Sequence, residues 1–258
     1  MVNIILNGCC GRMGRMVTQI CSEDDGVRIV AGIDPTCGTI FAEGYFVYKD
    51  IQEFRRNGRR TAENHVVIDF SSPSCTDQVL DFCAETGTAV VLCTTGLSDA
   101  QLQHVEKASE TTAVLRSANM SMGINLLQKL LKEAAPILAE AGFDIEILEK
   151  HHNRKADAPS GTALALADTI NGALDRSHDL VYARTGKRNK DEIGISSIRG
   201  GTIVGDHDVI FAGTDEVITL SHSAQSRAVF AKGAVQAAKF LIEKPNGIYT
   251  MSDVLEGR

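Results

Sequence analysis

The segment VNIILNGCCGRMG, residues 2–14, decides the fold of this 258-residue chain. Residues 2–6 are an apolar run interrupted only by Asn3, as in a buried parallel strand. Glycines follow at residues 8, 11 and 14, and later apolar residues recur at helical spacing: Met13, Met16, Val17, Ile20 and Cys21. The pattern predicts a strand, a glycine turn and a helix, the opening unit of a Rossmann-like α/β domain with a parallel sheet.

The glycine turn indicates a place for the pyrophosphate of a dinucleotide. Glycine lacks a Cβ, so a phosphate can approach the backbone and rest on the helix N-terminus. The spacing differs from the commoner G-x-G-x-x-G, which leaves a plain tight turn as the alternative. A second apolar strand, Val27–Ile33, then ends in Asp34, twenty residues beyond Gly14. A carboxylate there can accept hydrogen bonds from ribose hydroxyls, although a turn aspartate before Pro35 would also fit.

Two more apolar runs end in hydroxyl residues. Residues 65–70 lead to Ser71-Ser72, and residues 89–93 lead to Thr94-Thr95. Helical patterns follow both runs, so a parallel sheet with right-handed crossovers is expected, and its ligands should lie at the carboxyl ends of the strands. The hydroxyls, like Ser117 and Asn119 after another short run, could instead cap helices. Their shared location favours a cofactor site.

The sequence after residue 120 predicts a second layer. Apolar residues mark a long helix at Ile124, Leu127, Leu131, Ala135 and Leu138. Residues 143–148 alternate as a half-buried strand, and short strands at 193–199, 208–211 and 217–221 are separated by glycines, which favours an antiparallel or mixed sheet. The basic stretch 171–191 is interpreted as a solvated loop rather than a guide for an anionic substrate. His207 and His222 are interpreted as exposed turn residues rather than metal ligands.

The segment EKHHNRKADAPSGTAL, residues 149–164, predicts a site for a small anion. Four basic residues stand within five positions: His151, His152, Arg154 and Lys155. The sequence PSGT at 159–162 then begins a helix, whose N-terminus offers backbone N–H groups and the positive end of a dipole. The basic residues alone would suit an ordinary polar loop. Their position beside a helix start favours a ligand that carries carboxylate or phosphate.

Composition excludes several classes of protein. Hydrophobic residues make up 43% and charged residues 23%, the formal net charge is -7, and the pI is near 5.5. An acidic globular chain of this kind is not expected to bind nucleic acid. No apolar run is long enough for a membrane span and no basic leader is present, so a cytoplasmic protein is expected. The seven cysteines lack zinc-ligand spacing and are odd in number, which favours reduced thiols and no metal site.

The chain resembles the 4-hydroxy-tetrahydrodipicolinate reductase (dihydrodipicolinate reductase) family over nearly its whole length. The resemblance rests on GCCGRMG at 8–14, CTTG at 93–96, SANMSMGIN at 117–125 and the segment 149–164. The last of these is highly specific. The glycine turn and CTTG alone are not.

The resemblance implies an enzyme of lysine and diaminopimelate biosynthesis that uses NADH or NADPH to reduce a small dicarboxylate, a cyclic conjugated imine, to tetrahydrodipicolinate. Residues 1–121 with 228–258 would bind the dinucleotide, and residues 122–227 would bind substrate and form a homotetramer. Hinges between the two parts would allow closure over bound substrate. The alternatives are another small nicotinamide dehydrogenase and a catalytically silent NAD-binding regulator.

The matched motifs also imply roles for single residues. His151 takes the place of an acid/base and Lys155 that of a proton donor, while His152, Gly161 and Thr162 take the places of substrate-carboxylate contacts. The implied cofactor contacts are Gly8, Cys9, Cys10, Gly11, Arg12, Met13, Asp34, Cys93, Thr94, Thr95, Ser117, Ala118, Asn119 and Met120. The chemistry is consistent, because hydride addition to an imine puts electron density on the ring that a protonated group must neutralise.

Some positions depart from common family usage. Cys9 and Cys10 stand where small residues are usual, Cys93 where glycine is frequent, and Met120 where phenylalanine is frequent. Pro35 is more consequential, because many relatives have an arginine after the acidic residue to meet the 2′-phosphate of NADPH. Asp34 would repel that phosphate, so NADH is predicted to be the preferred cofactor.

Overall fold

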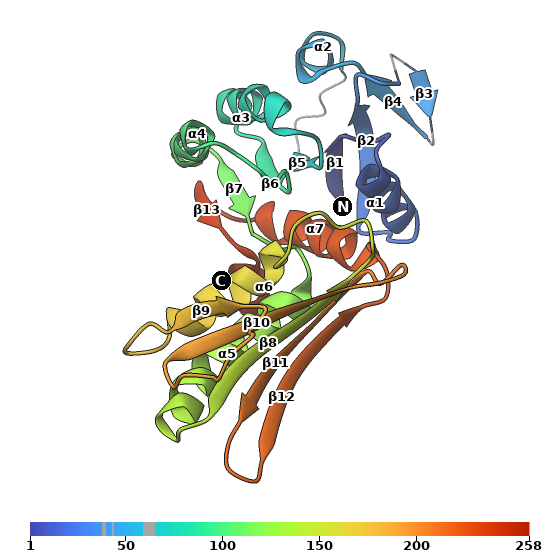
Figure 1. The fold of residues 1–258 in the computed structure, drawn as a ribbon. Coiled ribbons are helices and arrows are strands. Elements are labelled where there is room, and N and C mark those ends of the chain that lie inside the picture. The colour runs from blue at the N-terminus through green and yellow to red at the C-terminus, as the bar shows by residue number, and fades with distance from the viewer. Residues whose placement is uncertain (38–39, 43, 59–64, 258) are drawn as a thin grey trace. The chain divides into compact units, whose positions relative to one another are not determined.

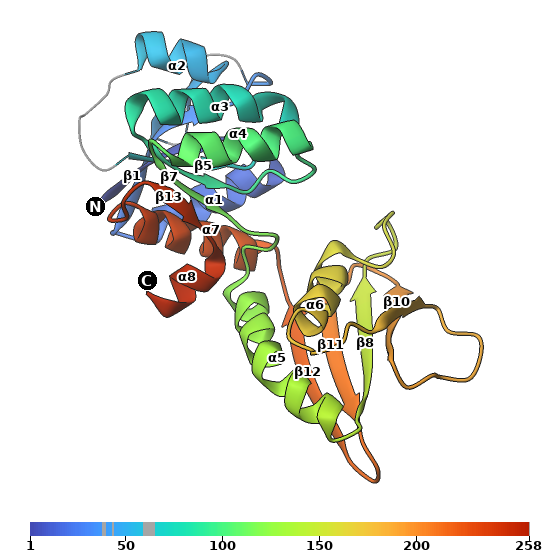
Figure 2. The same ribbon diagram turned by 90° about the vertical axis from the view of Figure 1, so that its left-hand side faces the viewer.

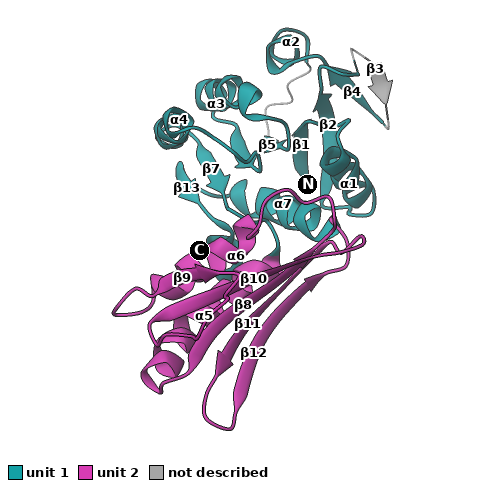
Figure 3. Cartoon of the chain, in the orientation of Figure 1, with its two compact units in different colours: residues 1–121, 228–258 teal, residues 122–227 magenta. Residues whose placement is uncertain are grey.

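The computed structural model describes residues 1–37, 40–42, 44–58 and 65–257. The chain divides into two compact units (Figure 3): Met1–Ser121 with Ala228–Arg258 forms unit 1, and Met122–Arg227 forms unit 2. The binding roles that the sequence analysis attaches to these two parts stay predictions. Among the described residues, no helix is both long and apolar enough to cross a membrane.

Unit 1 is built on an eight-stranded sheet in the order β13-β7-β6-β5-β1-β2-β4-β3. The strands are β1 (Val2–Asn7), β2 (Val27–Ile33), β3 (Ile40–Ala42), β4 (Tyr45–Tyr48), β5 (His65–Asp69), β6 (Ala89–Leu92), β7 (Ala113–Arg116) and β13 (Gly247–Tyr249). All neighbouring strands pair in parallel except β3 and β4. The expected Rossmann-like parallel sheet is therefore confirmed.

Helices cover both faces of this sheet (Figures 1 and 2). They are α1 (Arg12–Ser22), α2 (Ile51–Asn57), α3 (Pro73–Thr86), α4 (Asp99–Ser109), α7 (Ala228–Leu241) and α8 (Met251–Glu256). Helices α1 and α7 pack together against one face, and α2, α3 and α4 lie on the other. Buried strand residues such as Ile5, Val67 and Val90 pack there against Phe54 and Phe82. Both faces of a doubly wound sheet are covered, which explains why its strands are apolar throughout.

Helix α7 follows unit 2 in the chain but belongs to unit 1, because small residues allow it to approach the Met120 backbone closely. At Gly233 an added Cβ would lie 1.7 Å from the Met120 carbonyl oxygen. Ala231, Ala234, Ala237 and Ala238 are also buried on this helix. Segments more than 100 residues apart in the chain thus complete one domain.

Unit 2 has a mixed five-stranded sheet in the order β12-β11-β8-β10-β9. The strands are β8 (Asp144–His151), β9 (Asp179–Tyr182), β10 (Glu192–Arg199), β11 (Gly205–Ala212) and β12 (Val217–Ala224). Helices α5 (Met122–Glu140) and α6 (Gly161–Asn171) pack against one face through Leu131, Leu166 and Ile170. The expected mixed sheet is confirmed, and its strand β8 alternates buried and half-buried residues from end to end.

The interpretation of residues 171–191 as only a solvated loop was wrong. Strand β9 lies inside this stretch and pairs in parallel with β10. Arg184 bonds both Glu146 and Glu192, and Arg188 bonds Glu146 and Asp144. The sheet offers carboxylates along β8 and β10 that local sequence does not reveal, and these arginines are held in ion pairs with them.

Candidate active site

The sequence-derived cofactor residues of unit 1 follow the carboxyl ends of adjacent parallel strands. Strand β1 pairs with β2 on one side and with β5 on the other, so the chain order reverses at β1. Residues that follow β1, β2, β6 and β7 therefore meet at one edge of the sheet (Figure 1). Such an edge, beside a topological switch point, is where ligands bind in open α/β sheets.

The glycine turn leaves the start of α1 open. Gly8 has a φ of 80°, and an added Cβ would lie 2.6 Å from the Phe70 carbonyl oxygen. At Gly14 an added Cβ would lie 2.2 Å from the Gly8 carbonyl oxygen, so the helix approaches the turn too closely for any side chain there. Gly11 is the N-cap and gives no side-chain bond to the first turn. The N–H groups of that turn are therefore suited to an anionic ligand.

Asp34 lies at the end of β2 beside this turn. Its Oδ2 accepts a hydrogen bond from the Cys10 backbone N at 3.0 Å, and its Oδ1 accepts from the backbone N and Oγ1 of Thr36 at 3.0 and 2.6 Å. The side chain is buried. Asp34 thus ties the glycine turn to the loop after β2, which is the turn role that the sequence left open, and its contact with a ribose stays a prediction.

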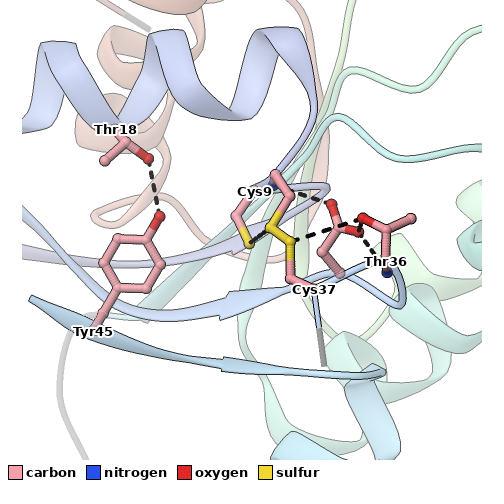
Figure 4. The surroundings of a disulfide bond; sticks show 7 residues. Cys9, Thr18, Thr36, Cys37 and Tyr45 are labelled. Carbon is pink, nitrogen blue, oxygen red and sulfur yellow. Dashed lines mark hydrogen bonds between the residues drawn. A yellow bond between two sulfur atoms is a disulfide. The ribbon is translucent and has the colours of Figure 1, made fainter. Parts of the chain in front are cut away.

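The expectation that all cysteines are reduced was wrong. Cys10 and Cys37 form a disulfide that joins the glycine turn to the loop after β2 (Figure 4). The sequence spacing could not reveal this pair, because β-strand pairing brings together residues that are 27 positions apart. Cys9 is buried next to the disulfide, and burial followed by the charge of Asp34 raises the pKa of its thiol to about 11.

Cys9, Cys10 and Asp34 also form a group with metal-ligand chemistry, since one ligand atom from each lies within 4.8 Å of the others. The Cys10 sulfur is bonded to Cys37, and both oxygens of Asp34 accept hydrogen bonds from protein donors. These three residues are thus engaged within the protein.

A buried carboxylate that sequence reasoning missed organises the same edge. Asp69 accepts hydrogen bonds from Asn7 Nδ2 at 2.8 Å, Ser71 Oγ at 2.6 Å and Thr94 Oγ1 at 2.7 Å. It is fully buried at the end of β5. Thr94, a predicted cofactor residue, is therefore itself a buried structural contact. The signal was an aspartate inside the apolar run 65–70, since a buried acid requires several donors.

The remaining unit 1 residues differ in exposure. Thr95 and Ala118 are exposed, and Ser117 and Asn119 are partly buried. Asn119 Oδ1 accepts a bond from the Ser121 backbone N at 2.8 Å, a turn contact just before α5. Met120 is buried and Cys93 is partly buried. Burial, followed by the charge of Asp69, raises the pKa of the Cys93 thiol well above its ordinary value.

In unit 2, the predicted anion site lies at the start of α6. Ser160 is the N-cap, and its Oγ accepts a hydrogen bond from the Ala163 backbone N at 3.1 Å. Gly161 is exposed, with nothing within 4 Å of the position of an added Cβ. Thr162 is the next residue and is partly buried. The open first turn leaves room for a carboxylate to approach the backbone.

The basic residues stand in the loop between β8 and α6. Lys155 is partly buried, and its Nζ lies 2.8 Å from Asp157 Oδ2. The Nδ1 of His152 is buried without a hydrogen-bond partner among the described residues. Burial, followed by the charge of Arg227, lowers the pKa of His152. A neutral imidazole with one unpartnered nitrogen can still donate or accept a hydrogen bond from a ligand.

His151 ends β8 on the buried face of the sheet, bonded to a carboxylate. Its Nδ1 lies 2.6 Å from Glu149 Oε2. Arg199 donates to both oxygens of Glu149, at 2.6 and 2.7 Å, and the Ser160 backbone N donates at 3.1 Å. Burial raises the pKa of Glu149, but hydrogen bonds from Arg199, Ser197 and His151 outweigh this effect and lower the pKa to about 2.

Glu149 and Arg199 were missed as site residues, although the alternation of β8 contains the signal. Glu149 has the same parity as Ile145 and Ile147, so it faces the core and needs a cation. The interpretation of His207 and His222 as exposed turn residues was also wrong, since His222 is a partly buried residue of β12. His207 is buried in β11, its Nε2 lies 3.0 Å from Ser160 Oγ, and burial lowers its pKa to about 4.

Known proteins match the whole chain. The family described as "Dihydrodipicolinate reductase, N-terminus" matches residues 2–120, and "Dihydrodipicolinate reductase, C-terminus" matches residues 123–255. The chain is 49% identical over 259 residues to a 4-hydroxy-tetrahydrodipicolinate reductase of Caldanaerobacter subterraneus, covering 99% of both chains. It is 45% identical over 260 residues to the enzyme of that name from Clostridium novyi, covering 100% of both. A solved structure of dipicolinate-bound dihydrodipicolinate reductase from Paenisporosarcina sp. TG-14 has the same fold, with a TM-score of 0.78, 22% identity and 97% coverage of each chain.

Proposed function

The chain belongs to the dihydrodipicolinate reductase family, and we propose that it reduces 4-hydroxy-tetrahydrodipicolinate to tetrahydrodipicolinate with NADH or NADPH. It is an NAD(P)H-dependent oxidoreductase of lysine and diaminopimelate biosynthesis. One structural observation carries this proposal beyond family likeness. His151 and the cap of α6 bond the same carboxylate, Glu149, at 2.6 and 3.1 Å. A group able to transfer a proton and a helix start able to bind an anion thus belong to one assembly.

The proposed cofactor residues are those that follow the strands of unit 1, from Gly8 to Met13, Asp34, Cys93 to Thr95 and Ser117 to Met120. The open first turn of α1 supports a pyrophosphate contact, because its cap, Gly11, gives no side-chain hydrogen bond. The close approach of Gly14 to Gly8 also supports the pyrophosphate contact, because this packing holds the start of α1 against the glycine turn. When bound, the reduced nicotinamide supplies the hydride.

The proposed substrate is a small dicarboxylate. The dipicolinate in the Paenisporosarcina structure is itself a dicarboxylate, which supports this chemistry. One carboxylate would bind the first turn of α6 through the N–H groups of Gly161 and Thr162, and His152 would contact the substrate's other carboxylate. Two anchored anions would fix the orientation of the ring.

Lys155 and His151 are the proposed proton-handling groups. Hydride addition to the conjugated imine leaves electron density on the ring, and a nearby ammonium or imidazolium can donate a proton to it. Lys155 is held by Asp157 at 2.8 Å and His151 by Glu149 at 2.6 Å, so both side chains are oriented by carboxylates.

We also propose NADH as the preferred cofactor. Asp34 lies at the end of β2, where the ribose is proposed to bind, and is followed by Pro35, which has no cation to offer a 2′-phosphate. Steady-state kinetics should therefore give a kcat/KM for NADH at least tenfold above that for NADPH, about 1.4 kcal/mol. Pro35→Arg should narrow the ratio by lowering the KM for NADPH. Equal or better efficiency of the wild-type protein with NADPH would contradict the preference.

A homotetramer formed through unit 2 is a further part of the proposal. Among the described elements, α5 and α6 cover one face of the unit 2 sheet and none covers the other. By strand register, that other face carries the apolar residues Leu148, Ile198, Ile210 and Val217. Sedimentation velocity tests the state, and a monomer at micromolar concentration would contradict it. A cytoplasmic location stays a prediction.

The decisive experiment couples the chain to the aldol-condensing synthase that makes its substrate. Loss of NADH absorbance should depend on both synthase product and chain. Activity with amino acids or hydroxy acids instead would favour a different nicotinamide dehydrogenase. NADH binding without any turnover would favour a silent regulator.

A further inference from the structure

Glu149 is an acidic residue in a position that usually holds an apolar one. It lies on the core-facing side of β8, in register with His207 of β11 and Ser197 of β10, and its side chain has no exposed surface. Burying a carboxylate is costly unless several donors compensate. An apolar residue at this position would need no such donors, so packing of the core does not explain why a glutamate stands here.

Arg199 alone would satisfy that need. Its guanidinium donates two bonds to Glu149, at 2.6 and 2.7 Å, and such a bidentate pair neutralises the charge. Nη2 also donates to the Asp157 carbonyl oxygen at 2.7 Å, which ties down the loop that carries Lys155. Because Arg199 cancels the charge of Glu149, the carboxylate does not repel an anionic ligand.

Two further bonds of Glu149 go to the proposed site. Oε2 accepts from Nδ1 of His151 at 2.6 Å, and Oε1 accepts from the backbone N of Ser160 at 3.1 Å. A hydrogen bond from Nδ1–H to a carboxylate fixes one tautomer of a histidine and leaves Nε2 to exchange protons. The contact to Ser160 fixes the residue that caps α6.

The surroundings of Nε2 suit that role. Gly205 lies beside it, and an added Cβ would lie 3.0 Å from Nε2, so a glycine there keeps the ring's second nitrogen from being crowded. His207, which is also on β11, packs edge-on against the His151 ring, with ring centroids 5.2 Å apart. Burial keeps His207 neutral near pH 7, since its pKa is lowered to about 4.

We propose that Glu149 is a positioning residue for the reduction: it holds His151 through Nδ1 and, with Arg199, fixes the loop and the helix start that bind substrate. The inference deepens the proposed function and depends on it, because it gives the proton-handling role to Nε2 of His151. Glu149 itself exchanges no proton. The charged and titratable groups facing His151 are Glu149 on its own strand, Arg199 on β10, His207 on β11 and His152 in the loop.

The first test is Glu149→Gln, which keeps the shape but removes the charge. The expected turnover is about 10²-fold lower, because the imidazole loses its fixed orientation and the negative charge beside it. The KM for NADH should stay within about twofold, because the cofactor residues are in unit 1. The limb of the pH profile of kcat/KM that reports protonation of the site should move to lower pH, a change that mere loosening of the fold would not produce.

Ser160→Ala is the matched control. It removes the cap bond to Ala163 and the contact to His207 but leaves the backbone N–H that bonds Glu149. It should lower the melting temperature and raise the KM for substrate, with the pH profile unchanged. If Ser160→Ala moves the profile as far as Glu149→Gln does, the positioning role is overturned.

A second measurement does not depend on whether a Glu149 variant folds. Long-range proton–nitrogen NMR on the uniformly labelled wild-type chain distinguishes histidine tautomers, and His151→Asn identifies the resonance. A proton on Nδ1 in the neutral form supports the proposal, and a proton on Nε2 overturns it. A wild-type chain that oxidises no NADH with the synthase product overturns the proposed function and the role of His151 together. An active chain whose Glu149→Gln variant keeps its kcat and pH profile overturns this inference alone.

Discussion

Replacing Lys155 by methionine separates catalysis from folding in this protein. The side chain is partly buried in the loop before α6, and its Nζ lies 2.8 Å from Asp157 Oδ2. Methionine keeps most of the apolar stem but removes the ammonium, and with it the proposed proton donor. The cofactor residues proposed in unit 1 are unchanged.

The structure of the site gives the expected size of the effect of Lys155→Met on turnover and on folding stability. Loss of a general acid lowers turnover by at least about 10²-fold, which corresponds to about 2.7 kcal/mol of activation barrier. The ion pair contributes much less to folding, because the Asp157 side chain is 58% exposed and the Lys155 side chain is 21% exposed. Ion pairs of this kind contribute about 0–1 kcal/mol, so the melting temperature should fall by no more than about 4 °C.

Two further variants sharpen the assay. Lys155→Arg keeps a cation for Asp157 and the substrate, but its guanidinium does not lose a proton near neutral pH. It should keep the substrate KM near normal and still lose turnover. Lys239→Met removes a partly exposed ion pair to Asp24 in unit 1, at 2.6 Å, and should keep turnover.

Coupled turnover, NADH titration and thermal unfolding are measured on the wild type and all three variants. Wild-type turnover in Lys155→Met would remove Lys155 from the chemistry. Wild-type turnover in Lys155→Arg, with loss in Lys155→Met, would assign it an electrostatic role instead of proton donation. A loss of NADH binding in either Lys155 variant would refute the assignment of cofactor binding and proton donation to separate residues.

Four other predictions concern pH, the disulfide and the glycine turn. Burial lowers the pKa of His207 to about 4 from 6.5, so on acidification this histidine takes up a proton in the unfolded chain before it does so in the folded chain. The free energy of unfolding should therefore fall as the pH drops from 6.5 to about 4. His207→Gln should flatten that part of a series of urea-unfolding measurements at different pH. The pKa of Glu149 is about 2, against an ordinary value of 4.5, so the free energy of unfolding should fall further between pH 4.5 and about 2. Cys37→Ser should lower the unfolding free energy of oxidised protein by about 3 kcal/mol, because the disulfide closes a loop with a separation of 27 residues, and an equal urea midpoint for both proteins would contradict this. Gly14→Ala should weaken NADH binding at least tenfold, about 1.4 kcal/mol, because its Cβ would lie 2.2 Å from the Gly8 carbonyl oxygen; an unchanged Kd in a fluorescence titration would refute it.

Much of the fold was predictable because its signals are local. The apolar runs, the glycines at 8, 11 and 14, and the helical spacing after them predicted the parallel sheet of unit 1. The alternation of residues 143–148 and the glycine-separated runs beyond 190 predicted a mixed sheet. Short elements were harder: β9 and β13 are only four and three residues long, too short for a periodic signal.

The candidate site was only partly predictable. The segment 149–164 predicted basic residues beside a helix start, and the structure has them in that arrangement. Their orientation was not predictable, since Arg199 bonds Glu149 across a separation of 50 residues and His207 bonds Ser160 across 47. The same limit explains the errors at His207 and at the Cys10–Cys37 disulfide.

The sequence by itself determined most of the longer strands and helices, which family the chain resembles and which residue types stand at the strand ends. These properties can be recognised from residues that lie close together in the sequence. The tertiary structure alone decided that Glu149 is the common partner of His151, Arg199 and Ser160. The physical reason is strand register. Pairing β8 with β10 and β11 brings distant side chains to one buried face, and a shift of one residue would turn Glu149 to the opposite face of the sheet.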